Sequence, residues 1–378
     1  MTTVAAESAK SATRLPSLDV FRGMAVAGMV FVNNPGSWDH VWWPFDHAAW
    51  NGCTPTDLVF PFFLFIVGVA MAFSLEKYTP ENRPTAEVYW RIFRRSALLF
   101  GFGLLLNGFP FYDLSTIRIL GVLQRISLTY LFASLIVLNL PRLQQWLLAG
   151  FLLVGYWAAM TLIPVPGFGA GVLTDTGNLG AWIDRSIIGT AHLYGQKMFD
   201  PEGLLSTLPA IVSVLFGYFA GRWLRKQPIE TQTSKTLATL GLGCLIFGWF
   251  WELIFPINKQ LWTSSYVVFT TGWALIVLAV CFEIIEVRAQ KALGSPFEVF
   301  GLNAIVLFVG SGIVGRILKR IHIGTGEQAP TIVTWIYEHG FAPWAGPLVG
   351  SHLYAVANLL VWWLVLYSLY RRHWFLKV

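Results

Sequence analysis

Long apolar segments recur along the whole chain and alternate with short polar stretches. Ten of them are centred on residues 18–34, 55–75, 96–112, 119–139, 146–163, 204–224, 236–256, 263–285, 297–315 and 348–370. Each approaches the roughly 20 apolar residues that an α-helix needs to cross a bilayer core of about 30 Å. The runs are continuous, whereas the strands of a transmembrane barrel would alternate. The pattern predicts an all-α, polytopic membrane protein with about ten transmembrane helices.

The composition supports this prediction. Hydrophobic residues make up 55% of the chain and charged residues only 12%, about half the charged fraction of a typical soluble domain. The first 16 residues are small and polar, without the apolar centre of a signal peptide. We therefore expect residues 1–16 to form a disordered cytoplasmic tail and residues 17–378 to form one transmembrane domain.

The distribution of Lys and Arg predicts the orientation in the membrane. With these ten segments, 18 of the 26 basic residues fall on the same side as the N-terminus and seven on the other. Because basic loops stay in the cytoplasm, both termini are expected there. The net charge of +6 then comes from cytoplasmic loops that face anionic membrane lipid, and it predicts no nucleic-acid partner.

The polar loop between the first two segments carries the residues best suited to chemistry. His47 offers an imidazole that works near neutral pH as a base or a nucleophile in acyl transfer. A histidine in a tryptophan-rich loop is also a common interfacial anchor. Asn33, at the end of the first segment, is suited to stabilising an oxyanion, or simply to ending a helix.

Several charged residues in or beside the apolar segments have two interpretations. Thr54-Pro55-Thr56-Asp57 has the pattern of a helix capping box, and Asp57 also faces the loop that holds His47. Asp19 and Arg22 are spaced to form an ion pair on one helix face. Arg125 lies inside a predicted span, where a charge indicates a functional site unless it is paired; Glu252 is a candidate partner.

The order of these motifs resembles one family. SLDVFRG, MVFVN, DHAAWNG, TDLVFPFFLFIVG, GVLQRI, DPEGLLSTLPAI, INKQLWTSSYV and GLNAIVLF follow one another along the chain. Together they resemble the transmembrane domain of the heparan-α-glucosaminide N-acetyltransferase family. The resemblance implies an acyltransferase that moves acetyl from cytosolic acetyl-CoA, as co-substrate, to the amino group of a glucosamine-type sugar on the periplasmic side.

The resemblance also implies roles for particular residues. The family's catalytic pair falls on Asn33 and His47. The remaining residues fall into two groups, one facing the sugar and one facing acetyl-CoA. The sugar side comprises Trp50, Asp57, Asp200, Glu202 and Trp262, with Lys259 beside Trp262 at the mouth, and the acetyl-CoA side comprises Arg22, Gln124 and Arg125.

Other function classes remain open at this point. An amino-sugar transporter would also need intramembrane charges, and an O-acyltransferase of a cell-envelope glycan would use the same site. The sequence has no HExxH motif and no CxxC pair, and its three cysteines show no metal spacing, so no metal is expected. We expect a multi-pass protein of the bacterial inner membrane, and an apolar helix face would support a homodimer.

Overall fold

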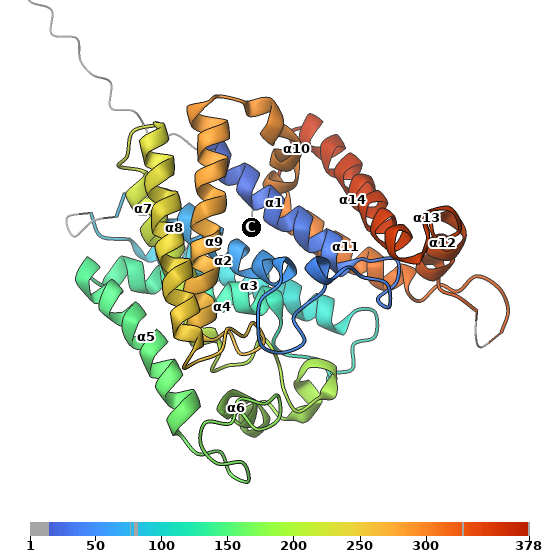
Figure 1. Cartoon of the computed structure of the whole chain (residues 1–378), viewed down its shortest axis with the longest axis horizontal. Helices are drawn as coiled ribbons and strands as arrows, with labels where there is room; N and C mark the ends of the chain where they lie inside the picture. The colour runs from blue at the N-terminus through green and yellow to red at the C-terminus, as the bar shows by residue number, and fades with distance from the viewer. Residues whose placement is uncertain (1–14, 76, 79–81, 327–328, 377–378) are drawn as a thin grey trace, which may run out of the picture.

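The chain folds into helices joined by loops (Figure 1). The computed structural model describes residues 15–75, 77–78, 82–326 and 329–376. Within these residues the only β-type pairings are isolated bridges. The predicted all-α fold is therefore confirmed.

Six helices of the described chain are long and apolar enough to cross a membrane. A seventh crossing is formed if the bent pair α10–α11 counts as one span. The six are η2–α2 (Pro55–Ser74), α4 (Val122–Asn139), α5 (Arg142–Leu162), α7 (Thr207–Leu224), α9–η5 (Ser264–Val287) and α14 (Pro347–Arg371).

Three further long helices coincide with predicted segments but are less apolar: α1 (Pro16–Asn33), α3 (Ala86–Gly108) and α8 (Thr231–Glu252). The helix α3 begins ten residues before the predicted 96–112. Its first turns carry three arginines, yet Val88, Ile92, Ser96 and Leu99 are buried along one face. An apolar window misses this start because the first three turns are amphipathic.

Close helix pairs hold the bundle together. α1 packs on α10 (Lys291–Leu302), α2 on α7, and α8 on α9. The pair α8 and α9 lies side by side in Figure 1. Glycines allow these close approaches. A Cβ on Gly23 would lie 1.8 Å from the carbonyl oxygen of Phe297, and one on Gly68 would lie 1.9 Å from that of Val214. Small residues at such crossings are typical of membrane helix packing.

The predicted segment 297–315 is bent in the structure. Helix α10 ends at Leu302 and α11 (Ala304–Leu318) continues at 65° to it. Between them, the Asn303 side chain donates to the carbonyl oxygen of Trp374 (3.1 Å) and accepts from the Leu376 amide (3.1 Å). The polar side chain at the break thus fixes the C-terminal segment against it.

The two long segments predicted to cover one face contain short helices. Residues 164–203 include α6 (Leu179–Ile187) and the 3-10 turns η3 (Thr190–His192) and η4 (Tyr194–Gln196). Residues 316–347 include α12 (Ile332–Gly340) and α13 (Ala342–Ala345), beside the start of α14. Residues 1–14 of the predicted tail lie outside the described residues, and Pro16 already begins α1.

Candidate active site

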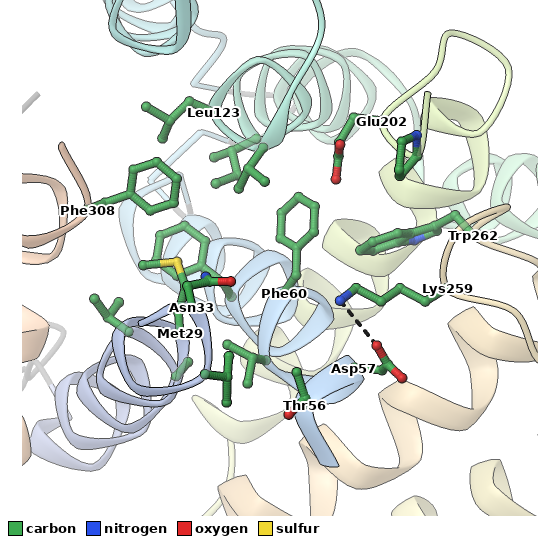
Figure 2. Close-up of a pocket in the computed structure, with 18 of the residues that line it drawn as sticks. Met29, Asn33, Thr56, Asp57, Phe60, Leu123, Glu202, Lys259, Trp262 and Phe308 are labelled. Atoms are coloured by element: carbon green, nitrogen blue, oxygen red, sulfur yellow. Dashed lines mark ion pairs between the residues drawn. The ribbon is translucent and has the colours of Figure 1, made fainter. Parts of the chain in front are cut away.

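A cavity of about 420 Å³ opens among α1, α2, α3, α4 and α11 (Figure 2). At one end lie the loop residues His47 and Lys259, and at the other Arg95 and Tyr130. The helix α3 starts at the end of the bundle opposite the His47 loop. Arg95 is nine residues from that start, or about 14 Å along a helix. The cavity therefore reaches from the loop end of the bundle deep toward its opposite end.

The start of α2 positions Asp57 at this cavity. Thr54 and Asp57 form the predicted capping box, in which Asp57 Oδ2 accepts from the Thr54 amide (3.1 Å). The same oxygen accepts from the amide of Ala48 (3.0 Å). The Asp57 side chain is 1% exposed, so a capping motif holds a buried carboxylate beside the His47 loop.

His47 is the partner of that carboxylate. Its Nδ1 lies 2.6 Å from Asp57 Oδ1. The Lys259 ammonium lies 3.2 Å from the same carboxylate oxygen (Figure 2) and 3.0 Å from His47 Nδ1. An ionised carboxylate can only accept, so the 2.6 Å contact to Asp57 assigns the Nδ1 proton to the imidazole, and the Lys259 ammonium then donates to the carboxylate and not to Nδ1. His47 Nε2 then carries the free lone pair that a base or nucleophile needs.

Asn33 lies on another wall of the same cavity. It is the last residue of α1, it is exposed, and its side chain lies at the cavity in Figure 2. Its backbone is helical, and the helix ends at Asn34 instead. The structure thus brings both predicted catalytic residues, Asn33 and His47, to one cavity from different elements.

Two tryptophans predicted to contact substrate also line the cavity. Trp50 donates from Nε1 to the carbonyl oxygen of Leu173 (2.9 Å). Trp262 is 1% exposed and adopts a left-handed backbone (φ 52°). Such a conformation costs a bulky residue about 1–3 kcal/mol and is concentrated at functional sites.

One arginine pairs with two carboxylates beside the cavity. Arg118 donates to both oxygens of Asp200, at 2.9 and 2.6 Å, and also pairs with Glu202. Burial opposes the charge, but these carboxylates raise the pKa of Arg118 above its usual range. Glu202 lines the cavity, whereas Asp200 is buried behind it and also accepts from two backbone amides.

Arg125 does not pair with Glu252 as predicted, and its described partners are other residues. Arg125 is 1% exposed and donates to Ser206 and to the carbonyl oxygen of Gly203, and its guanidinium lies 5.0 Å from the Trp262 ring. Its described partners do not include Glu252. Glu252 is the last residue of α8. Opposite charge and similar depth in the membrane therefore predicted the wrong partner for Arg125.

The other residues expected to hold acetyl-CoA lie apart from the main cavity. Gln124 is buried at an adjoining chamber. Arg22 is ion-paired with Asp19, as its spacing suggested, and donates to the carbonyl oxygen of Gly301 (2.6 Å). The cation at the inner end of the cavity is instead Arg95, whose guanidinium lies 4.8 Å from the Tyr130 ring. Sequence reasoning missed it because α3 was expected to start beyond it.

A thiol nucleophile is disfavoured at this site. Burial, and next the Asp57 carboxylate, raise the pKa of Cys53 to about 12. Since the thiolate is the reactive form, Cys53 is unreactive near neutral pH. Within the part of the chain that the structure describes, no group of three His, Cys, Asp or Glu residues is placed to hold a metal ion.

Comparisons with known proteins bear on the site's identity. A family model for the catalytic region of heparan-alpha-glucosaminide N-acetyltransferase matches residues 14–248. The human protein of that name is 32% identical, over 79% of this chain and 52% of its own length. The mouse protein of the same name is 32% identical, over 80% of this chain and 54% of its own length. The chain spans about half the length of these relatives. It belongs to the heparan-alpha-glucosaminide N-acetyltransferase family.

Proposed function

We propose that the protein is a transmembrane N-acetyltransferase. It moves acetyl from acetyl-CoA to the amino group of a glucosamine-type sugar, with residues 17–378 acting as one domain. The single observation that supports this most is the His47–Asp57–Lys259 cluster on the wall of a cavity that also holds Asn33 and extends inward to Arg95.

The proposed orientation follows from the basic residues. With both termini in the cytoplasm, the inner end of the cavity at Arg95 faces the cytosol and His47 faces the periplasm of a bacterial inner membrane. Acetyl-CoA enters from the Arg95 side, where a guanidinium suits the phosphates of the CoA arm. The amino sugar enters from the His47 side.

In the proposed reaction, the sugar amine attacks the thioester carbonyl carbon and the carbon–sulfur bond breaks. His47 Nε2 takes the proton that the amine loses, and CoA leaves as the thiolate. Asp57 keeps the Nδ1 proton in place, as the orienting carboxylate of a triad does. The Asn33 side-chain amide donates to the developing oxyanion.

A two-step route uses the same residues. His47 Nε2 would attack the thioester first, CoA would leave, and the acetyl-imidazole would then pass its acetyl group to the amine. This route gives ping-pong kinetics and an acetylated His47 peptide in the absence of sugar. Direct transfer gives neither.

The deciding experiment measures thiol release from acetyl-CoA by purified protein in detergent, with and without glucosamine. We expect sugar-dependent release that His47→Ala abolishes. His339→Ala is a matched control, because His339 is exposed on α12 and stacks on Trp335 away from the cavity. Release that survives His47→Ala would remove His47 from the site, and absence of release with folded protein would favour an amino-sugar transporter.

A further inference from the structure

The loop between α1 and α2 carries His47 and is held at two places. Toward its end, the hydroxyls of Thr54 and Thr56 donate to the carbonyl oxygens of Asp46 (2.7 Å) and Pro44 (3.1 Å). Its first half lies against the start of α14, more than 300 positions further along the chain. Among the described residues that line the cavity, none belongs to α14. The contact with α14 therefore acts on the loop and not on the cavity wall.

Ser351 forms the first part of this contact. Its backbone carbonyl oxygen accepts from the Gly36 amide (3.1 Å). Its hydroxyl accepts from the Ser37 amide and donates to the Ser37 carbonyl oxygen, both at 3.0 Å. Ser351 is buried, and a Cβ on Gly36 would lie 3.2 Å from its Cα. The chain that leaves α1 thus passes α14 with its backbone in direct contact.

His352 forms the second part, and its neighbours define its tautomer. Ring Nδ1 lies 2.8 Å from the carbonyl oxygen of Leu348. A carbonyl oxygen can only accept, so Nδ1 carries the proton. Nε2 is then an acceptor, and the Trp42 amide donates to it (3.3 Å). The imidazole also stacks on the Trp42 indole, with ring centroids 4.7 Å apart, and is 8% exposed.

These contacts fix the chain immediately before His47. The Trp42 carbonyl oxygen accepts from the Phe45 amide (2.8 Å), at the turn η1 (Trp43–Phe45). The centroid of the Phe45 ring lies 5.3 Å from that of His352. His47 follows this turn by two residues, and its side chain is 41% exposed. Burial alone therefore does not hold the imidazole, and its approach to Asp57 depends on where the turn is placed.

We propose that Ser351 and His352 are positioning residues for the reaction, because they hold the loop that presents His47 to Asp57. The inference rests on the proposed function, in which His47 is the base or nucleophile. His352 acts through the Trp42 amide and does not touch substrate. A displacement of about 1 Å in a catalytic group costs up to about 10²-fold in rate, so a small shift of this loop is enough to slow acetyl transfer.

Two substitutions of His352 separate the hydrogen bond from the ring packing. His352→Phe keeps a ring beside Trp42 and removes the acceptor, whereas His352→Gln restores an acceptor near the position of Nε2. For purified protein in detergent, we expect His352→Phe to lower kcat for thiol release about tenfold or more, with the KM for acetyl-CoA unchanged. His352→Gln should recover most of that loss. His339→Phe is the matched control, because His339 is exposed on α12.

Hydrogen exchange measured by mass spectrometry tests the contact without catalysis. We expect His352→Phe to speed exchange in the peptide that covers residues 36–45, and His352→Gln to restore slow exchange there. Ser351→Ala removes both bonds of the hydroxyl to Ser37, so it should speed exchange in the same peptide and also lower kcat. The start of α2 should exchange as in the parent protein, because Asp57 still holds it.

Unchanged exchange in residues 36–45 of both His352→Phe and Ser351→Ala would overturn the proposal, and so would faster exchange with full kcat. A loss of kcat that His352→Gln does not recover would also contradict it, since the hydrogen bond to Trp42 would then not be the cause. A parent protein that releases no thiol would contradict the proposed function. The exchange data would still decide whether Ser351 and His352 hold the loop.

Discussion

At the scale of single residues, the two oxygens of the Asp57 carboxylate have different partners. Oδ2 accepts from the amides of Ala48 and Thr54, which starts the helix and fixes the loop. Oδ1 faces the imidazole of His47 and the ammonium of Lys259. Because one carboxylate does both, the local stability of the helix start and the orientation of His47 are coupled.

Replacing Asp57 by Asn separates these two effects. The amide oxygen can still cap the helix, so we expect the melting temperature to change by only a few degrees. It holds the imidazole proton poorly, so kcat should fall by about 10²–10⁴-fold. Steady-state thiol release and thermal unfolding measure both quantities. Asp39→Asn, on an exposed loop position, should match the parent protein; a similar loss there would make the effect nonspecific.

Lys259 is expected to act through the carboxylate. Lys259→Gln leaves the buried Asp57 charge paired with the imidazole alone, and we expect kcat to fall about tenfold or more. Lys259→Arg should retain most of the activity because it keeps the charge. A rise in KM for the sugar with unchanged kcat would instead show that Lys259 binds the acceptor directly.

At the scale of elements, a buried acid on α6 bonds to the segment that leads into α7. Asp184 is 1% exposed and accepts from the Leu204 amide (2.8 Å). Burial raises its pKa to about 6, although the hydrogen bond from Leu204 lowers it. The native protein therefore holds a proton that the unfolded chain releases near pH 4.

This shift predicts how stability changes with pH. As pH rises from about 4 to about 6, the folded state loses up to about 3 kcal/mol from Asp184, and the loss is complete above that range. Asp184→Asn keeps the acceptor for Leu204 and removes the charge, so it should raise the melting temperature at pH 7 and have little effect at pH 4. Thermal unfolding at several pH values measures this. A variant less stable than the parent at pH 7 would contradict the assignment.

Local patterns predicted most elements of this chain but not their partners. The Thr54–Asp57 capping box and the Asp19–Arg22 pair were visible because their members are three residues apart. The ion pair of Arg118 with Asp200 joins residues 82 positions apart, and no local pattern encodes it. The bend at Asn303 was hidden because its contacts come from the C-terminal segment.

At the scale of the whole molecule, the shape of the cavity depends on where its helices cross. α1 carries Asn33 to the cavity, and its packing against α10 is set where Gly23 approaches Phe297 and Gly301. The α10–α11 bend then turns α11 so that Ala304 and Phe308 form another part of the cavity wall. Displacing this crossing would therefore move a wall of the site.

Gly23→Ala tests that dependence. Its Cβ would meet backbone atoms of α10 that cannot rotate away, so we expect more than about 3 kcal/mol of destabilisation and loss of thiol release. Gly101→Ala is the matched control, because Gly101 lies in the helix α3 with no atom within 4 Å of its added Cβ. That change should stabilise the protein by about 0.5–1 kcal/mol through helix propensity. Thermal unfolding and activity of both variants would show whether the α1–α10 crossing holds Asn33 in place; a fully active, stable Gly23→Ala protein would mean that it does not.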